Sequence, residues 1–289
     1  MRGNLPRPIA VLRASGALYI KQKMYYNSER PYNSYYAGEW RNMHIMLTND
    51  DGIFAPGLRE LSKAAVAAGH RVTIFAPDSQ RSAASHAISL TKPLKVERVP
   101  YDGIAAYSVN GTPADCAKLG LFLLRDDLPD IVISGVNRGS NRGAAIIYSG
   151  TVGAATEASI SGVPAVAVSL CKSCNDGYEC AARLGVRTAE WALKNPLPRG
   201  EIYNLNVPYG AKPLGVRAAT VSNEYIFNPI YEETPEGYVM VTGENVLPET
   251  DENSDMELTH AGYATLSVIG WNRLAATKLN DFDELNEGI

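Results

Sequence analysis

The 289-residue chain lacks any apolar run that approaches the roughly 20 residues needed to span a bilayer. Segment 9–20 is the most apolar stretch near the start, but Arg13 and Ser15 interrupt it, and it has no secretory pattern. The chain is also poor in cysteine: Cys116, Cys171, Cys174 and Cys180 do not form the disulfide framework of a secreted protein. We therefore expect a cytoplasmic protein with no membrane partner.

The chain has no excess of positive charge. It carries 27 Lys and Arg against 31 Asp and Glu, a formal net charge of −4. A broad basic face for a nucleic-acid duplex is therefore not expected. The P-loop motif, the Gly-x-Ser-x-Gly of α/β-hydrolases, the Cys-x₅-Arg of cysteine phosphatases and the Asp-x-Asp-x-Thr of aspartyl-phosphate phosphatases are all absent. The four His residues are scattered and have no zinc-ligand spacing.

The first 42 residues differ in composition from the rest. They hold six of the chain's 16 Tyr, and seven Lys and Arg against Glu29 and Glu39, with no helical or strand period over 21–42. Two interpretations remain: an aromatic, basic arm that docks on a partner or a nucleic acid, or a flexible leader with Met43 as the true initiator. The leader interpretation is favoured, because chain termini are commonly disordered.

From residue 43 the chain alternates between short apolar runs and amphipathic helices. A strand over 44–48, a helix over 56–68 and a strand over 71–76 follow each other with short connections. Such a βαβ unit implies an α/β fold with a mainly parallel sheet. The pattern further predicts helices over 114–124, 150–161 and 178–194, and buried strands over 130–134, 165–170 and 202–207. Beyond 208 it predicts strands over 216–221, 238–242 and 263–269, and a solvated acidic loop over 249–257.

Polar loops follow the predicted strands at the ends where ligands bind in open α/β sheets. These loops are 49–52 (NDDG), 77–83 (PDSQRSA), 135–143 (GVNRGSNRG) and 149–151 (SGT), the last opening a helix. We expect all four to converge on one rim of the sheet.

The adjacent acids Asp50 and Asp51 repel each other unless a cation neutralises them. A hard divalent ion with oxygen ligands, Mg²⁺ or Mn²⁺, is suited to this role, and Gly52 supplies the turn that both acids need to reach one ion. The alternative is an Asp-Asp-Gly surface turn that caps the next helix. The position at the end of the first strand favours the metal.

Each of the other polar groups at this rim has a functional and a structural interpretation. Ser149, Gly150 and Thr151 open a helix, whose free N–H groups suit a phosphate, but Ser149 or Thr151 also suits simple N-capping. Asn137 and Asn141 offer carbonyl oxygens to a metal or shape a turn. The neighbouring arginines offer bidentate phosphate contacts or lie on a solvated loop face; they are Arg138 and Arg142.

Two histidines and a cysteine cluster lie outside these loops or at their margin. His70 follows a helix end and is expected to be structural, whereas His86 lies in the 81–90 loop near the rim and is a weaker candidate for shaping the site. Cys171-x-x-Cys174, with Cys180 nearby, lacks a fourth metal ligand at suitable spacing, so ordinary reduced thiols are expected.

Six segments together resemble the SurE (survival protein E) family of metal-dependent 5′-nucleotidases. In order and spacing they are 48–52 (TNDDG), 76–86 (APDSQRSAASH), 111–116 (GTPADC), 134–139 (SGVNRG), 148–152 (YSGTV) and 204–208 (NLNVP). The resemblance runs from Met43 to about residue 208 and continues loosely to the C-terminus. The leader before Met43 departs from the family pattern.

The resemblance implies a Rossmann-like three-layer core and a C-terminal β-rich extension used to form a homodimer or homotetramer. It implies one SurE-like domain over 43–289, with the core over about 43–208 and the extension over about 209–289. The family's metal positions fall on Asp50, Asp51, Ser82 and Asn137. One divalent ion per subunit is expected there.

The resemblance also implies the reaction: release of phosphate from nucleoside 5′-monophosphates, with 3′-nucleotides and short polyphosphate as further family substrates. Asp50 or Asp51 orients or deprotonates the attacking water, with Asp50 favoured. Ser149, Gly150 and Thr151 hold the phosphate with Asn141, and Asn137 is shared between metal and phosphate. The alternative is a non-catalytic nucleotide-binding or regulatory module that uses the same rim. The four intact metal positions favour the enzyme.

Overall fold

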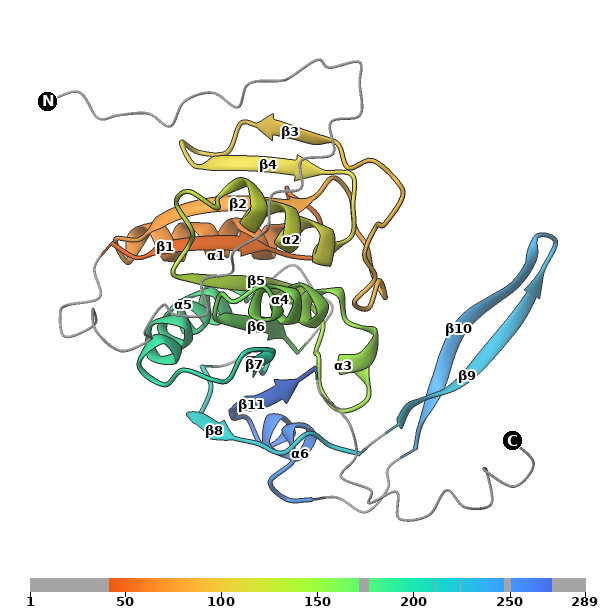
Figure 1. Ribbon diagram of the computed structural model, residues 1–289. Helices are drawn as coiled ribbons and strands as arrows, with labels where there is room; N and C mark the ends of the chain where they lie inside the picture. Colours follow the sequence, from red (N-terminus) through yellow and green to blue (C-terminus); the bar gives the residue numbers. More distant parts are fainter. Residues whose placement is uncertain (1–41, 172–176, 211, 224, 247–250, 272–289) are drawn as a thin grey trace, which may run out of the picture. The chain divides into compact units, whose positions relative to one another are not determined.

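A computed structural model describes residues 42–171, 177–210, 212–223, 225–246 and 251–271. Its centre is a nine-stranded sheet with the strand order β3-β4-β2-β1-β5-β6-β7-β11-β8 (Figure 1). Six neighbouring strands are parallel: β4 (Ala105–Val109), β2 (Arg71–Pro77), β1 (His44–Thr48), β5 (Ile131–Arg138), β6 (Ala165–Leu170) and β7 (Glu201–Val207). The predicted α/β fold with a mainly parallel sheet is thus confirmed.

The outer strands run against this direction. At one edge β3 (Val96–Val99) pairs antiparallel with β4. At the other edge β11 (Ala264–Gly270) pairs antiparallel with β7, and β8 (Val216–Ala218) pairs parallel with β11. Two strands of the predicted C-terminal extension are therefore continuous with the core sheet.

Helices cover both faces of the sheet, which gives the predicted three layers (Figure 1). On one face lie α1 (Pro56–Ala67) and α5 (Tyr178–Lys194), and on the other lie α2 (Pro113–Leu123) and α4 (Gly150–Ile160). Two short helices, α3 (Ala145–Tyr148) and α6 (Asp255–His260), lie in connections. Local sequence signals set the helix starts: Pro56 occupies the first turn of α1, and Thr112 forms a capping box with Asp115 at α2.

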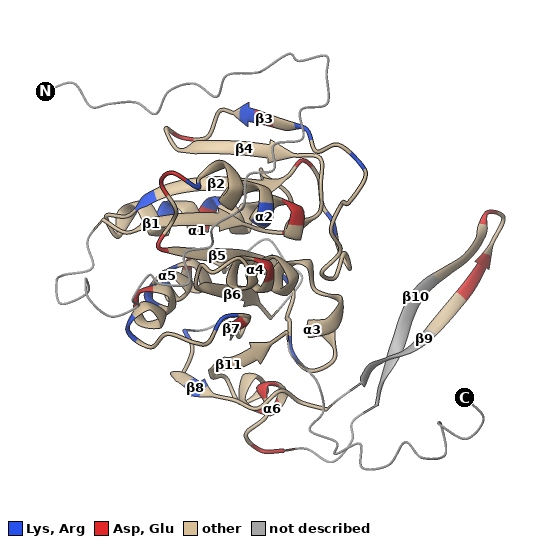
Figure 2. Ribbon diagram, in the orientation of Figure 1, with Lys and Arg blue, Asp and Glu red and all other residues tan. Residues whose placement is uncertain are grey.

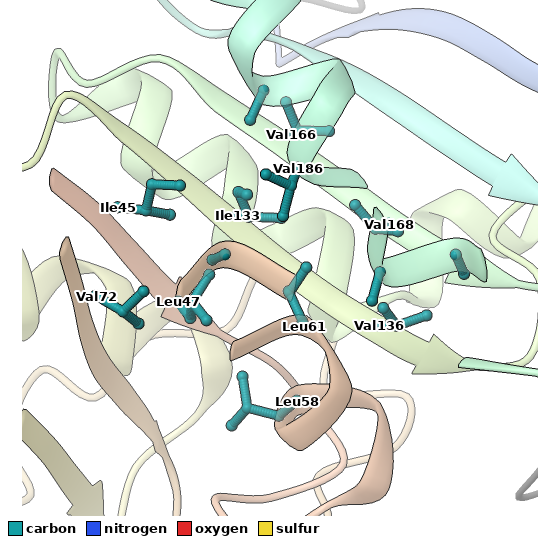
Figure 3. Packing of buried hydrophobic residues seen from close by; sticks show 14 of the residues in the cluster. Ile45, Leu47, Leu58, Leu61, Val72, Ile133, Val136, Val166, Val168 and Val186 are labelled. Atoms are coloured by element: carbon teal, nitrogen blue, oxygen red, sulfur yellow. The ribbon is translucent and has the colours of Figure 1, made fainter. Parts of the chain in front are cut away.

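The core consists of two apolar layers separated by the sheet. Figure 3 shows the layer under α1 and α5, where Leu58 and Leu61 of α1 and Val186 of α5 meet Leu47, Ile133 and other strand side chains. These side chains are almost fully buried, so α1 and α5 owe their position to apolar burial rather than to helix propensity.

A separate two-stranded antiparallel sheet consists of β9 (Tyr225–Thr234) and β10 (Gly237–Val246). Its closed end is acidic, with Glu232, Glu233 and Glu236 near the turn (Figure 2). The sequence pattern had indicated only the 238–242 part of this hairpin.

The sequence predictions were wrong at three places. β5 continues through Asn137 and Arg138, which were expected in a loop. Strands β3 and β4 were not predicted at all. The acidic run 249–257 is not simply a solvated loop, because α6 begins at Asp255 and buries that side chain.

Two other expectations concern residues that the structure does not describe. Residues 1–41 of the predicted leader, and Cys174, lie outside the described residues. Within the described part, no helix combines the length and the apolar character that a membrane crossing requires.

Candidate active site at the carboxyl ends of the strands

The acids Asp50 and Asp51 lie directly beyond β1, in a turn that the neighbouring residues hold closed. Buried Asn49 donates from Nδ2 to the carbonyl oxygen of Gly52 at 2.9 Å. Gly52 has φ +103°, a conformation that favours glycine, and a Cβ there would come within 3.3 Å of the Ser79 backbone. Asp50 is 6% exposed, and Asp51 is partly buried.

Asp50 is held at the start of α4. Its Oδ1 accepts a hydrogen bond from Thr151 Oγ1 at 2.6 Å, and its Oδ2 accepts one from Thr151 N at 3.3 Å. A Cβ on Gly150 would come within 2.9 Å of the Asp50 Cβ, so only glycine allows this approach without a shift. The anion that the N-terminus of α4 holds in this structure is therefore a carboxylate of the protein itself.

The pKa of Asp50 is raised to about 6. Burial is the main cause and the negative charge of Asp51 adds to it, while the hydrogen bonds from Thr151 oppose them. Burial also raises the pKa of Asp51, opposed by the backbone N–H and the positive charge of Arg138. Both carboxylates are thus unfavourably ionised in the absence of a cation.

The end of β5 reaches Asp51 directly. Asp51 Oδ2 accepts a hydrogen bond from Arg138 N at 3.0 Å. The neighbouring Asn137 donates from Nδ2 to the carbonyl oxygen of Gly139 at 2.9 Å, which leaves its Oδ1 as the amide atom outside that hydrogen bond. The extension of β5 past its predicted end is what carries Asn137 to this position.

The loop after β2 is attached to the same turn. Arg81 N donates to the Asp50 carbonyl oxygen at 2.7 Å, and Ile53 N donates to the Pro77 carbonyl oxygen at 2.8 Å. Ser82, next to Arg81, is exposed, and its Oγ accepts a hydrogen bond from Gln80 Nε2 at 2.9 Å. The structure therefore places Ser82 one residue from a backbone contact with Asp50.

The same loop carries strained backbone and is held at further points. Ala83 and Ser85 have φ +55° and +53°, the left-handed region that non-glycine residues rarely adopt. Ser85 N donates to the Tyr148 carbonyl oxygen at 3.0 Å, and Ser85 Oγ donates to that of Ile147 at 2.7 Å. These contacts connect the loop to α3, just before Ser149.

His86 takes part in an ionic cluster around the buried Glu157. Its Nε2 lies 2.9 Å from Oε2 of Glu157 on α4, and Lys118 of α2 donates to Glu157 Oε1 at 2.5 Å. Burial alone would raise the pKa of Glu157, but these two partners outweigh it and lower that pKa. The cluster connects the 81–90 loop to the helix that holds Asp50. His70 lies just after α1, and its Nε2 is 3.1 Å from Oε1 of Glu190, which agrees with the predicted structural role.

Two predicted phosphate-binding residues are engaged within the protein. Ser149 Oγ accepts a hydrogen bond from Val152 N at 3.1 Å, which is the N-capping arrangement. Thr151 is fully buried and uses its hydroxyl on Asp50. That these residues and Gly150 contact a substrate stays a prediction.

Asn141 is also buried and engaged. Its Nδ2 donates to Ser169 Oγ at 2.8 Å, and its backbone N donates to Asn206 Oδ1 at 2.8 Å. The carbonyl oxygen of Asn141 accepts hydrogen bonds from Asn204 Nδ2 and Asn206 Nδ2 at 2.8 and 3.0 Å. A substrate contact of Asn141 likewise stays a prediction.

Asn204 and Asn206 position the loop after β5, a role that was not predicted from the sequence. Both are fully buried on β7 and hold the loop after β5 through Asn141. The signal was present as two amides at alternating positions of an otherwise buried strand, since such side chains require partners inside the protein.

Among the residues that the structure describes, no histidine or cysteine joins Asp50 and Asp51 in a metal-binding group. In the described ranges, no three His, Cys, Asp or Glu side chains gather in a way that could hold a metal ion. A cation at Asp50 and Asp51 would therefore take its other protein ligands from neutral oxygens. Burial raises the pKa of Cys171 to about 11, which is consistent with an unreactive thiol.

The fold and the site together define a Rossmann-like α/β protein with a paired-carboxylate site at the carboxyl ends of its parallel strands. Residues 45–227 match the sequence model of the family described as Survival protein SurE. The chain belongs to this family.

Known relatives extend the match over most of the chain. A protein of Porphyromonas gingivalis named 5′-nucleotidase SurE is 40% identical over 251 residues, 84% of this chain and 96% of that protein. A Clostridium beijerinckii protein of the same name is 36% identical over 257 residues, 85% of this chain and 100% of that protein. The crystal structure of the SurE protein from Aquifex aeolicus superimposes with a TM-score of 0.71 at 30% identity, covering 84% of this chain and 99% of that one.

Proposed function

We propose that this chain is a metal-dependent 5′-nucleotidase that releases phosphate from nucleoside 5′-monophosphates. The observation that carries the proposal is the pair Asp50 and Asp51, held by Thr151 and Arg138 at the sheet edge where α/β enzymes bind ligands. Relatives at 36–40% identity over most of the chain bear the name 5′-nucleotidase SurE, which supports the same activity.

The residues present fit one divalent ion of the Mg²⁺ or Mn²⁺ type. Two carboxylates of raised pKa lie on adjacent residues, and the amide of Asn137 and the hydroxyl of Ser82 add neutral oxygens. Hard cations prefer such all-oxygen sets. We assign Asp50, Asp51, Ser82 and Asn137 as the residues that would hold the ion.

When bound, the ion supplies positive charge that polarises the phosphoryl oxygens and makes water more acidic. The chain's own groups supply orientation. Thr151 fixes the Asp50 carboxylate through two hydrogen bonds, and the Arg138 N–H fixes that of Asp51. We assign to Asp50 the orientation and deprotonation of the attacking water, because its position is the more constrained of the two.

The substrate contacts are proposed at the opening of α4 and the end of β5. Asn137 precedes Arg138, whose N–H contacts Asp51, and Gly150 and Thr151 contact Asp50. Ser149 precedes these two residues, and Asn141 lies in the loop after β5. Because Ser149 and Thr151 use their hydroxyls within the protein, their part in phosphate binding is proposed through backbone N–H groups of the helix start. Nucleoside 3′-monophosphates and short polyphosphate are included as further substrates.

The proposal extends to assembly and organisation. We propose a homodimer or homotetramer in the cytoplasm, built from a single domain over residues 43–289 with a leader over 1–42. The exposed apolar side chains of the β9–β10 hairpin support an interface between copies of the chain.

Phosphate release from a panel of nucleoside 5′- and 3′-monophosphates, with Mg²⁺, Mn²⁺ or EDTA, tests the function. We expect release that depends on the metal and is lost in Asp50→Asn. Saturable nucleotide binding without any release would instead favour the non-catalytic nucleotide-binding module. Asp130→Asn is the matched control, because Asp130 also accepts a backbone hydrogen bond, from His44 N at 2.8 Å, but at the start of β1 and β5 rather than at their ends.

A further inference from the structure

The loop over residues 139–144 connects the end of β5 to α3, and so lies in the chain between Asn137 and Ser149. One attachment of this loop comes from the sheet beneath it, through Asn141 and the two buried amides of β7. A second attachment comes from a distant part of the chain: Gly143 N donates to Asp255 Oδ2 at 3.0 Å.

Asp255 is a fully buried carboxylate with two backbone partners from different segments. Its Oδ1 accepts a hydrogen bond from Ser222 N at 3.0 Å, while its Oδ2 accepts the one from Gly143. Its own backbone N donates to the Thr220 carbonyl oxygen at 2.8 Å. One side chain thus joins the loop of the candidate site to the strand segment that precedes the hairpin.

The residues around Asp255 close the base of the β9–β10 hairpin. We call residues 219–223 and 251–255 the hairpin clasp, since the chain enters the hairpin after the first segment and returns through the second. Thr220 N donates to the Asn253 carbonyl oxygen at 3.1 Å, and Thr220 Oγ1 donates to Asp251 Oδ2 at 2.6 Å.

The N-cap of α6 is Ser254 and not Asp255. Ser254 Oγ accepts a hydrogen bond from Glu257 N at 3.3 Å. Burial raises the pKa of Asp255, opposed by the N–H groups of Ser222 and Gly143, by the positive charge of Arg142 and by the N–H group of Met256 in α6. A buried carboxylate is costly unless its hydrogen bonds compensate it, and those from Ser222 and Gly143 lead to the clasp and the loop.

We propose that Asp255 is a positioning residue that couples the hairpin clasp to the 139–144 loop of the candidate active site. Closure of the clasp holds Asp255 in place, and Asp255 in turn holds Gly143, so opening of the clasp removes one of the two attachments of the loop and leaves the one through Asn141. The coupling is reciprocal: whatever orders the loop also favours the closed clasp. The inference rests on the proposed function in one respect, namely that this loop belongs to the substrate site.

Hydrogen exchange of the intact chain tests the coupling without any substrate. In Asp255→Asn the amide presents one acceptor and one donor, so one of the two backbone N–H groups loses its partner. We expect exchange to accelerate roughly tenfold or more over both 139–144 and 219–223, as the loss of a hydrogen bond to a charged group implies. Ser254→Ala is the matched control, because the Ser254 hydroxyl only accepts the α6 hydrogen bond from Glu257 N, while the backbone contacts of the clasp and both hydrogen bonds to the Asp255 carboxylate remain. In this variant exchange should accelerate only over 256–260.

Nucleotidase kinetics on the same variants supply the second readout. Asp255→Asn should raise KM for a nucleoside monophosphate by a factor several times larger than the factor by which it lowers kcat. Ser254→Ala should lower Tm and leave both KM and kcat near their wild-type values. If Asp255→Asn matches Ser254→Ala in exchange over 139–144 and in KM, Asp255 only stabilises α6 and the coupling is refuted. A wild-type chain without nucleotidase activity would overturn the proposed function instead, and the exchange comparison would still decide the coupling.

Should Asp255→Asn fail to fold, Thr220→Val opens the clasp from its exposed side by removing the hydroxyl contact to Asp251. Faster exchange over 139–144 together with 219–223 would support the coupling. Faster exchange confined to the clasp would refute it.

Discussion

At the residue scale, the charge of Asp51 is the clearest determinant of the site. It raises the pKa of the buried Asp50, which burial has already raised, and the hydrogen bonds from Thr151 oppose both effects. Asp51→Asn should therefore lower the pKa of Asp50 and raise the Tm of the metal-free chain by about 2 °C, the shift expected for roughly 1 kcal/mol in a chain of this size. Turnover should fall more than about 100-fold, because even indirect changes around a metal cost 10–100-fold.

Thermal unfolding in EDTA and phosphate release in saturating Mn²⁺ measure the two effects on one preparation. Near-normal turnover at saturating metal would remove Asp51 from the metal ligands. A fall in Tm together with lost turnover would indicate that Asp51 is needed mainly for the fold.

The ionised form of Glu157 stabilises the fold, because its folded-state pKa lies below the usual value. This contribution is present above the ordinary pKa of about 4.5 and is lost as the pH falls through the lower, folded-state pKa. Glu157→Gln should thus lower Tm clearly at pH 7, and the difference from wild type should shrink steadily below pH ~4.5. Tm profiles of wild type and variant measure this.

Glu60→Gln is the control for that series, because Glu60 pairs with Lys63 at 2.7 Å on an exposed helix face, where such pairs contribute little. A Glu157→Gln difference that stays constant from pH 7 to pH 3 would contradict the role of the ionised cluster.

Much of the residue-level site could be predicted because parallel strands end at one edge, so the polar residues after β1, β2 and β5 had to meet there. The structure shows these contacts as the hydrogen bonds from Arg81 N to the Asp50 carbonyl oxygen and from Arg138 N to the Asp51 carboxylate. The inward direction of Thr151 was not predictable, because it depends on how closely Gly150 lets α4 approach β1. The partners of Asp255 lie 33 and 112 residues away in the chain, a distance that local patterns do not report.

At the scale of elements, the N-terminus of α4 controls the state of Asp50. The Thr151 hydroxyl lowers the pKa of Asp50 against burial, so Thr151→Val should raise that pKa above its value of about 6. Cation binding requires the ionised carboxylate, so the apparent Mn²⁺ affinity should weaken as the pH falls through about 6 in wild type, and at a higher pH in Thr151→Val.

Thr151→Ser keeps the hydroxyl and should follow the wild-type profile, which separates the hydrogen bond from the loss of side-chain volume. Titration of Mn²⁺ binding between pH 5 and pH 8 measures the midpoints. Identical midpoints for the Val and Ser variants would show that the hydroxyl has no influence on the carboxylate.

Which elements could be predicted follows from their burial. The strands β1 and β6 and the helix α5 have the predicted bounds, because they are buried runs or clear amphipathic stripes. β3 is partly exposed and has no such pattern. The start of α6 was not predicted because it lies within an acidic run. Acidic residues are typical both of a first helical turn and of a solvated loop, and the sequence does not show that Asp255 has buried partners.

At the scale of the whole molecule, the β9–β10 hairpin is the part of the described chain that we expect to bind a partner. A two-stranded sheet is marginal in water, and this one presents four apolar side chains that are between 45% and 70% exposed: Ile230, Tyr231, Tyr238 and Val239. Exposed apolar strands of this kind mark protein interfaces. We expect the wild-type chain to form a dimer or tetramer, and Tyr231→Asp with Tyr238→Asp to shift it to a smaller species.

Light scattering coupled to size-exclusion chromatography measures the assembly, with Glu232→Gln as the control that changes charge on the same hairpin without removing apolar surface. If the clasp transmits the state of the hairpin, the smaller species should also show faster exchange over 139–144 and a raised KM. Loss of assembly with an unchanged KM would leave the hairpin as an interface that does not influence the site. An unchanged assembly would place the contact between copies elsewhere on the chain.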